Sequence, residues 1–156
     1  MREEAIFAGG CFWGVEADFR AVPGVLDARV GYTGGDVPHP TYEEVCGGKT
    51  GHAEGVKVTF DPEKVSYEAL VRKFFELHDP TTLNSQGPDV GHQYRSAIFT
   101  TSAEQAEIAR RVRDELEAEG RFPSPIVTEI EGAGVFWEGE EYHQRYLEKR
   151  GRKICG

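Results

Sequence analysis

The residue best placed to do chemistry is Cys11, in the segment Gly9–Gly14 (GGCFWG). A short apolar run before it predicts a buried strand, and the pattern after it predicts a helix from about Phe12 to Ala21. Helix N-termini expose unpaired N–H groups and partial positive charge, so cysteine pKa values there fall from about 8.5 to roughly 3.5–7.5. The pattern therefore predicts a nucleophile, with Phe12 and Trp13 as an apolar wall for a small methyl or thioether group. The alternative is ordinary core packing.

Two segments that fit neither helical nor strand spacing hold further reactive side chains. Residues 31–52 and 79–93 are rich in Gly, Pro, Asn, Thr and Asp. Loops of that length in a compact domain are usually functional or disordered. Their reactive side chains, with one just beyond, are Tyr42, His52, Asp89, His92 and Tyr94. So many chemically capable groups favour function over disorder.

The elements that must position these groups follow the order β-α-β-β-α-β and then α-β-α. Strands are predicted at 4–8, 25–32, 54–60, 96–100 and 126–131, and helices at 12–21, 66–77, 103–119 and 140–150. Ser66 and Ser102 are predicted helix caps. The first six elements match the ferredoxin-like split βαβ arrangement. We therefore expect an α+β fold: a two-layer sandwich with a ferredoxin-like βαββαβ core and a mainly antiparallel sheet, extended by long loops and C-terminal elements.

Composition limits the classes of protein and partner. The 156 residues fit one catalytic domain over 1–156, with a flexible tail from about 151. A net charge of -9 argues against nucleic acid, and no apolar run approaches the roughly 20 residues of a membrane span. The N-terminus lacks the features of a signal peptide, so we expect a cytoplasmic monomer. The three cysteines contain no C-x-x-C pair, so we expect neither a metal site nor a cofactor.

Several short blocks form an ordered pattern from Phe7 to Leu147. They are GCFWGVE (10–16), GYTGG (31–35), TYEEVC (41–46), TGHAE (50–54), HDPTTLN (78–84), GHQYRS (91–96) and EYHQ (141–144). In these blocks and their order the chain resembles the A-type peptide methionine sulfoxide reductases. The resemblance implies reduction of the S epimer of methionine sulfoxide, free or in proteins, with electrons ultimately from thioredoxin.

The resemblance and the local context together suggest a role for each group. The Cys11 thiolate attacks the sulfoxide sulfur, and Glu54, kept neutral by burial, protonates the oxygen. Tyr42 and Tyr94 donate O–H bonds to the same oxygen. Asp89 helps to order the pocket. For Glu54 the alternative is a solvated carboxylate at a strand edge, and for each tyrosine it is amphipathic packing.

Recycling needs a second thiol, because attack leaves Cys11 as a sulfenic acid that condenses with thiols. The predicted resolving residue is Cys155, which follows Gly151 near the chain end and would form a disulfide for thioredoxin to reduce. Cys46 is the alternative resolving residue, although we expect it to be buried and inert.

Two other classes of protein remain open from sequence. One is a cysteine hydrolase or acyltransferase that pairs Cys11 with His52 or His92, which mutual geometry would decide. The other is a binding module that grips oxidised methionine through Phe12 and Trp13 without turnover. The sequence favours an ordering role for His52 within its loop.

Overall fold

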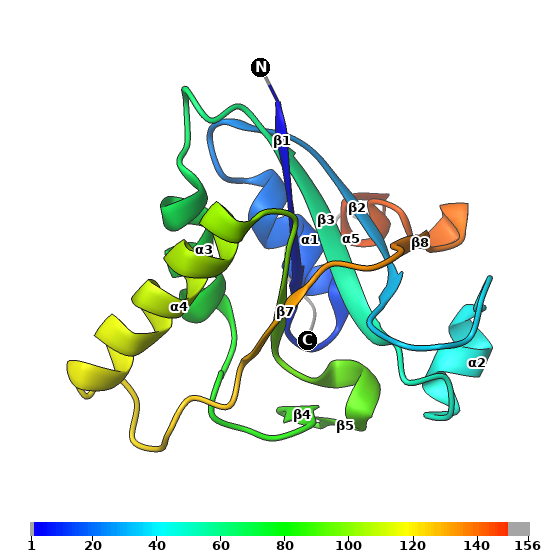
Figure 1. Cartoon of the computed structure of the whole chain (residues 1–156). Coiled ribbons are helices and arrows are strands. Elements are labelled where there is room, and N and C mark those ends of the chain that lie inside the picture. Colours follow the sequence, from blue (N-terminus) through cyan, green and yellow to red (C-terminus); the bar gives the residue numbers. More distant parts are fainter. Residues whose placement is uncertain (1, 150–156) are drawn as a thin grey trace.

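The computed structural model describes residues 2–149, which fold around a six-stranded sheet (Figure 1). In order across the sheet the strands are β7 (Glu129–Gly132), β6 (Ala97–Thr100), β1 (Glu3–Ala8), β3 (Ala53–Phe60), β2 (Val25–Thr33) and β8 (Trp137–Glu138). All neighbouring pairs are antiparallel except β6 and β7, which are parallel. The predicted α+β fold with a mainly antiparallel sheet is confirmed.

The alternation of apolar residues along β1 explains why both faces of the sheet are covered. Ala5 and Phe7 point into the main core, whereas Ile6 and Ala8 belong to a second cluster on the other face. Within residues 2–149 no helix contributes to that second cluster, against which Ala133 and Phe136 of the segment after β7 pack.

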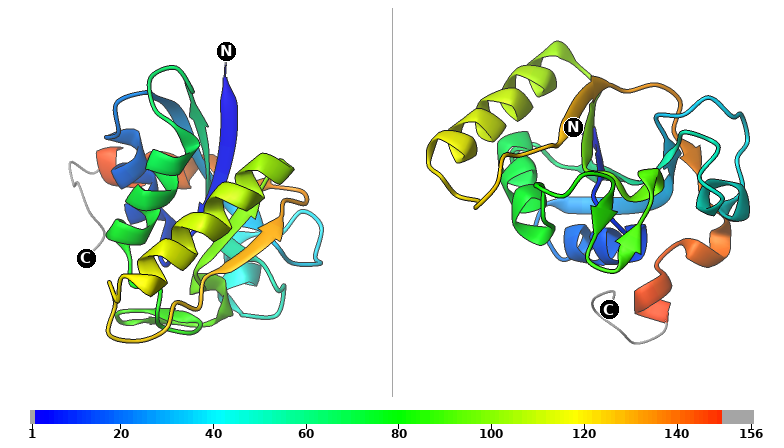
Figure 2. Two further views of the ribbon diagram at one scale, coloured as in Figure 1. Left: turned by 60° about the vertical axis from the view of Figure 1, so that its left-hand side comes forward. Right: turned by 90° about the horizontal axis from the view of Figure 1, so that it is seen from below.

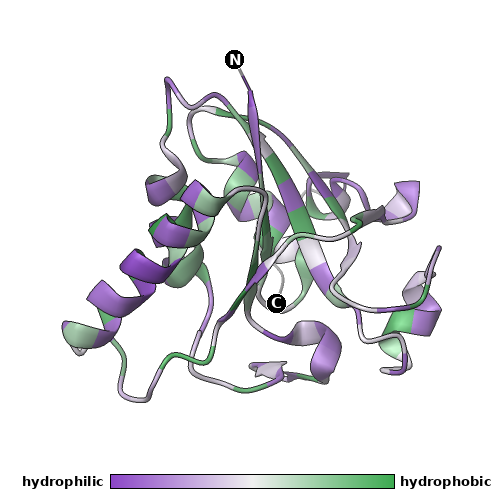
Figure 3. Cartoon of the chain, in the orientation of Figure 1, coloured by the Kyte–Doolittle hydropathy of each residue, from purple (hydrophilic) through white to green (hydrophobic). Residues whose placement is uncertain are grey.

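Three helices cover the first face. They are α1 (Phe12–Arg20), α3 (Tyr67–Leu77) and α4 (Ala103–Ala118), whose ribbons are drawn in Figure 2. Their buried side chains share one cluster with the sheet. The predicted caps are confirmed: Ser66 Oγ accepts the Ala69 N–H at 3.0 Å, and Ser102 Oγ accepts the Gln105 N–H at 3.1 Å. Figure 3 shows that the residues of α4 are largely hydrophilic. This fits a helix that buries only one stripe of its surface.

Both segments without clear periodicity contain short ordered elements that the sequence pattern did not predict. The first holds the helix α2 (Tyr42–Cys46), which begins with a capping box between Thr41 and Glu44. The second holds a hairpin of β4 (Ser85–Gln86) and β5 (Asp89–Val90), and the 3-10 helix η1 (His92–Tyr94) follows it. Elements of two to five residues are too short to show a hydrophobic period.

The predicted helix over 140–150 is wrong. A 3-10 helix η2 (Glu141–His143) is separated from a short helix α5 (Tyr146–Lys149) by Arg145, which has a left-handed φ of 56°. The break follows from Gln144, whose buried side chain accepts the Val30 N–H at 2.8 Å and donates to the Val30 and Gly139 carbonyls. These hydrogen bonds join Gln144 to Val30 of β2 and to Gly139, and they take the place of bonds within a continuous helix. The late strand also begins at Glu129 rather than Ile126.

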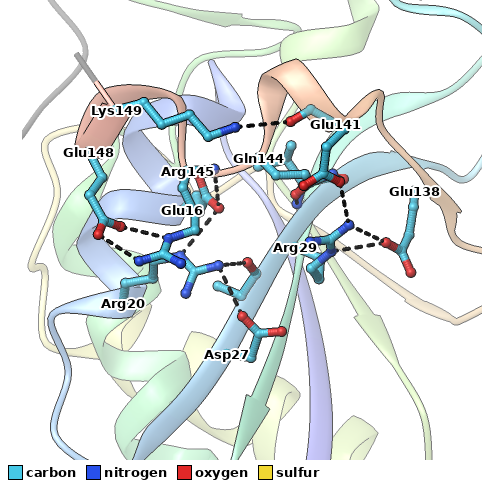
Figure 4. A network of polar contacts seen from close by, with 12 residues as sticks. Glu16, Arg20, Asp27, Arg29, Glu138, Glu141, Gln144, Arg145, Glu148 and Lys149 are labelled. Atoms are coloured by element: carbon cyan, nitrogen blue, oxygen red, sulfur yellow. Dashed lines mark hydrogen bonds and ion pairs between the residues drawn. The ribbon is translucent and has the colours of Figure 1, made fainter.

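Polar contacts fix the segment 138–149 against α1 and β2 (Figure 4). Both carboxylate oxygens of the buried Glu16 accept the Arg145 N–H, at 3.0 and 2.9 Å. Arg20 bridges Glu16 and Asp27. The last described helix is therefore held beside the helix that Cys11 heads. Among residues 2–149 no helix is both long and apolar enough to cross a membrane.

Candidate active site

Cys11 is the N-cap of α1 and is partly exposed. The turn before it depends on Gly10, which has a φ of 90°, and a Cβ there would lie 2.9 Å from the Gln86 side chain. A backbone turn and a helix start thus place the thiol at the N-terminus of α1, the position that the sequence predicted. A cleft of about 460 Å³ opens beside Cys11 and is also lined by Gly14, Asp18 and the Gln86–Asp89 part of the hairpin.

Glu54 is a buried acid on β3 with only 1% of its surface exposed. One oxygen, Oε1, accepts the Phe12 N–H at 3.3 Å, whereas Oε2 is buried and has no hydrogen-bond partner among residues 2–149. Burial raises the pKa of Glu54 to about 8, opposed by the Phe12 N–H and reinforced by the Asp89 carboxylate. The carboxyl group is therefore mostly protonated at neutral pH. The alternative of a solvated strand-edge carboxylate is wrong.

Tyr42 and Tyr94 lie close to this acid. Burial raises the pKa of both hydroxyls, and the charge of Glu54 raises them further, which places all three groups in one electrostatic cluster. Asp89 and Cys11 also act on Tyr94. The structure therefore brings together the polar groups that the sequence selected from separate loops.

Aromatic rings pack together next to Glu54, whose Oε1 accepts the Phe12 N–H. Phe12 is 1% exposed and stacks with Tyr42 at a centroid distance of 6.2 Å, so it belongs to the core. Trp13 is half-buried and stacks on Tyr146 of α5 at 3.9 Å. Its Nε1–H donates to Nδ1 of His143 at 3.0 Å. His143 is thus a hydrogen-bonded residue within the aromatic cluster, but it lies on η2 and not on the predicted helix.

Glu140 is a contributor to the site region that the sequence analysis missed. Its Oε2 accepts the backbone N–H of Tyr42 at 2.9 Å, and its Oε1 accepts the Tyr32 O–H at 2.7 Å. Burial alone would raise the pKa of Glu140, but these hydrogen bonds outweigh burial and hold it below its ordinary value. Its position directly before the EYHQ block was the only signal in the sequence.

The histidines proposed as partners of Cys11 are engaged elsewhere. Nδ1 of the buried His52 accepts the Gly35 N–H at 3.1 Å, so Nε2 carries the proton and donates to the Val37 carbonyl at 2.7 Å. His52 therefore orders its loop, as the sequence favoured. His92 is exposed, and its Nδ1 lies 3.2 Å from Nη1 of Arg95. Both histidines therefore bind groups other than Cys11, which argues against the pairing that a cysteine hydrolase would need.

Cys46 differs from its prediction because it is exposed, not buried. In the short helix α2 the buried position is the neighbouring Val45, which leaves Cys46 on the outer side. The pKa of Cys46 is nevertheless raised, mainly because its sulfur is partly desolvated. The hydrogen bond with the Tyr42 side chain opposes this rise and is the weaker effect. Cys155 lies outside the described residues. Within 2–149 no group of three His, Cys, Asp or Glu side chains is arranged to hold a metal ion.

A cysteine at the head of a helix, beside a buried acid that keeps its proton near neutral pH, is typical of enzymes that use a thiol. Comparison with known proteins makes the class specific. Residues 3–156 match the sequence profile of the peptide methionine sulfoxide reductases. The chain therefore belongs to this family of oxidoreductases.

Relatives of the A type match the chain over nearly its whole length. Peptide methionine sulfoxide reductase MsrA of Methanoculleus marisnigri is 58% identical over 98% of this chain and 93% of its own length. The MsrA of Methanothermobacter thermautotrophicus is 60% identical over 98% of this chain and 90% of its own length.

Solved structures of this type share the fold. Reduced Mxr1 from Saccharomyces cerevisiae superposes with a TM-score of 0.91 at 37% identity, over 99% of this chain and 88% of that one. Methionine sulfoxide reductase A of Corynebacterium diphtheriae superposes with a TM-score of 0.87 at 41% identity, over 99% of this chain and 77% of that one.

Proposed function

We propose that the chain reduces the S epimer of methionine sulfoxide, with Cys11 as the nucleophile and Glu54 as the proton donor. The observation that carries the proposal is the Glu54 carboxyl group, which is buried, protonated near neutral pH and unpartnered at Oε2. The Cys11 thiolate attacks sulfur while Glu54 protonates the oxygen. The attack forms a bond between the Cys11 sulfur and the substrate sulfur, and the protonated oxygen leaves as water after taking up a second proton. A water molecule then attacks the Cys11 sulfur and loses a proton, the bond between the two sulfurs breaks with its electron pair going to the substrate sulfur, and methionine is released while Cys11 becomes a sulfenic acid.

Selection of one epimer requires three fixed directions at the chiral sulfur. In our proposal the methyl group faces the wall of Phe12 and Trp13, and the oxygen faces Glu54 with Tyr42 and Tyr94. The remaining substituent, which leads to the peptide, points outward past Asp89. The mirror-image sulfoxide cannot meet all three conditions at once, and the S assignment itself comes from the family resemblance.

The recycling step of the proposal uses Cys155. Its thiol condenses with the sulfenic acid of Cys11, which releases water and forms a disulfide, and a thioredoxin dithiol then reduces that disulfide. The yeast relative Mxr1 has been solved in complex with Trx2, and this supports thioredoxin as the partner. A cytoplasmic location is part of the same proposal, because reducing compartments keep such thiols available.

The ferredoxin-like core also belongs to this proposal. Its support is the order β6-β1-β3-β2, which is antiparallel throughout, with α1 connecting β1 to β2 and α3 lying between β3 and β6 in the chain. The strand β7 and the short β8 then extend the sheet at its two edges.

The test compares Cys11→Ser with Cys46→Ser on separate epimers of methionine sulfoxide in a peptide. With dithiothreitol as reductant, wild type and Cys46→Ser should convert the S epimer and leave the R epimer. Cys11→Ser should be inactive, because a serine hydroxyl is not a comparable nucleophile at neutral pH. Reduction by Cys11→Ser at a rate within tenfold of wild type, or conversion of the R epimer instead, would overturn the proposal.

A further inference from the structure

Tyr42 is the first residue of the short helix α2, and its ring packs against Phe12, Trp13 and His143. The helix α2 has five residues and buries only Val45. Within residues 2–149, the side-chain hydrogen bonds that reach α2 from outside its own segment come from Glu140 and Gln93. The bond from Gln93 Nε2 to the Cys46 carbonyl is long, at 3.5 Å, whereas the Tyr42 N–H meets Glu140 at 2.9 Å. Glu140 is therefore the stronger of these two attachments.

Glu140 also contacts the strand pair that carries Glu54. Its second oxygen accepts the Tyr32 O–H at 2.7 Å, and Tyr32 is the direct cross-strand partner of Glu54 in the β2–β3 ladder. The Tyr32 ring packs against Phe12, which in turn stacks with Tyr42. One carboxylate thus connects the backbone of Tyr42 with the strand beside Glu54.

The Glu140 backbone is held in place on both sides. The Gly139 N–H donates to the Val30 carbonyl at 2.8 Å, and the Gly139 carbonyl accepts from Gln144 Nε2 at 3.0 Å. The Glu140 carbonyl accepts the His143 N–H at 2.9 Å. A carboxylate on so constrained a backbone can define the position of the Tyr42 N–H that it accepts, because the carboxylate itself has little freedom to move.

From these contacts we infer that Glu140 is a positioning residue that sets the placement of the Tyr42 hydroxyl relative to Glu54. The inference rests on the proposed function, in which both groups meet the same sulfoxide oxygen. Glu140 itself touches no reacting atom. It acts on the backbone N–H at the first residue of α2, where a negative charge also favours the helix.

The test is a double-mutant cycle on the single-turnover rate of sulfoxide reduction. Glu140→Ala should lower that rate by about tenfold to a hundredfold, since displacements of about 1 Å have effects of this size. In a Tyr42→Phe background the same change should alter the rate by no more than about twofold, because the hydroxyl that Glu140 positions is already gone. Glu140→Gln should restore most of the rate, as its oxygen can accept the Tyr42 N–H while its NH2 group donates to the Tyr32 oxygen.

Controls separate this role from general loss of structure and from failure of the proposed function. Glu138→Ala removes a nearby exposed carboxylate that pairs with Arg29, and it should leave the rate unchanged. The rate of Cys11 alkylation should be the same in all variants. Glu140→Asp, which cannot reach both partners, provides the same cycle if the alanine variant does not fold.

The inference fails if Glu140→Ala lowers the rate by the same factor with Tyr42 and with Tyr42→Phe, or if its rate stays within about twofold of wild type. Either result leaves the proposed function standing. If wild type itself does not reduce methionine sulfoxide, the proposed function fails instead.

Discussion

The backbone N–H of Phe12 donates to Oε1 of Glu54 across 3.3 Å. This hydrogen bond joins the first residue of α1, next to the thiol, to the strand that carries the acid. It occupies one carboxyl oxygen and leaves Oε2 buried and unpartnered. An unpartnered buried polar atom is costly, and in an enzyme it commonly indicates where a substrate group belongs. In the proposed reaction that group is the sulfoxide oxygen.

Replacing the acid by its amide tests this assignment. Glu54→Gln keeps the size and the acceptor for the Phe12 N–H but removes the transferable proton. The single-turnover rate should fall by about 10²–10⁴-fold, the usual contribution of a general acid. Glu131→Gln is the control for replacing a carboxyl by an amide, because Glu131 is exposed on the edge strand β7. An unchanged rate for Glu54→Gln would assign the proton to another group.

The pH dependence of the same step follows from the raised pKa of Glu54. The acid form is required, so the single-turnover rate should decline above about pH 8, by about tenfold per pH unit once most Glu54 is ionised. Ionisation of the attacking thiol acts in the opposite direction, since only thiolate attacks. In Glu54→Gln the fall in the single-turnover rate above pH 8 should disappear. The rise in rate that comes from ionisation of the thiol should remain. A wild-type rate that stays level from pH 7 to 10 would contradict this prediction.

The raised pKa also predicts how stability changes with pH. Because the pKa of Glu54 is about 8 in the folded protein and 4.5 ordinarily, the folded state holds the proton more tightly than the unfolded state. Its stabilising contribution is complete below pH 4.5 and is lost as pH rises to about 8. Glu54→Gln has no such loss, so its advantage in unfolding free energy over wild type should grow to on the order of 2–3 kcal/mol at pH 7.

Thermal or urea unfolding at pH 5, 7 and 9 measures this difference. The two proteins should be close at pH 5 and well separated at pH 9. A difference that is constant across the three pH values would mean that the Glu54 carboxyl group is not desolvated in solution as it is in the structure.

The sequence alone predicted the long strands and helices because each buries one periodic face. The stripe of Leu70, Val71 and Phe74 and the alternation in β3 are strong signals of this kind. The break at Arg145 gave no such signal, since it depends on bonds from Gln144 to β2, more than a hundred residues earlier.

The chemistry of the site was predictable to the extent that it depends on local context. The place of Cys11 at a helix head follows from a strand, two glycines and a helix that adjoin in sequence. The state of Glu54 does not, because its burial arises from tertiary packing. Glu140 shows the limit most clearly: both of its partners, Tyr32 and Tyr42, are about a hundred residues away in the chain.

The last prediction separates sulfoxide reduction from recycling of the enzyme. If Cys155 resolves the sulfenic acid, Cys155→Ser leaves the attack by Cys11 intact, because that step ends before the second thiol acts. One equivalent of sulfoxide should be reduced per enzyme in a fast burst. Turnover with thioredoxin should then collapse, because thioredoxin meets a sulfenic acid and not the disulfide with which it exchanges. Small dithiols should restore part of the turnover, since they can enter the pocket.

Cys46 provides the matched control for this experiment, because it is a thiol close to Tyr42 and exposed in the structure. Cys46→Ser should keep both the burst and the thioredoxin-supported rate. Mass spectrometry of wild type after one turnover without reductant should show Cys11 joined to Cys155, with Cys46 still open to alkylation. The raised pKa of Cys46 supports this outcome, because a thiol that resists ionisation supplies less of the thiolate that attacks a sulfenic acid. A bridge between Cys11 and Cys46 would instead make Cys46 the resolving residue and Cys155 dispensable.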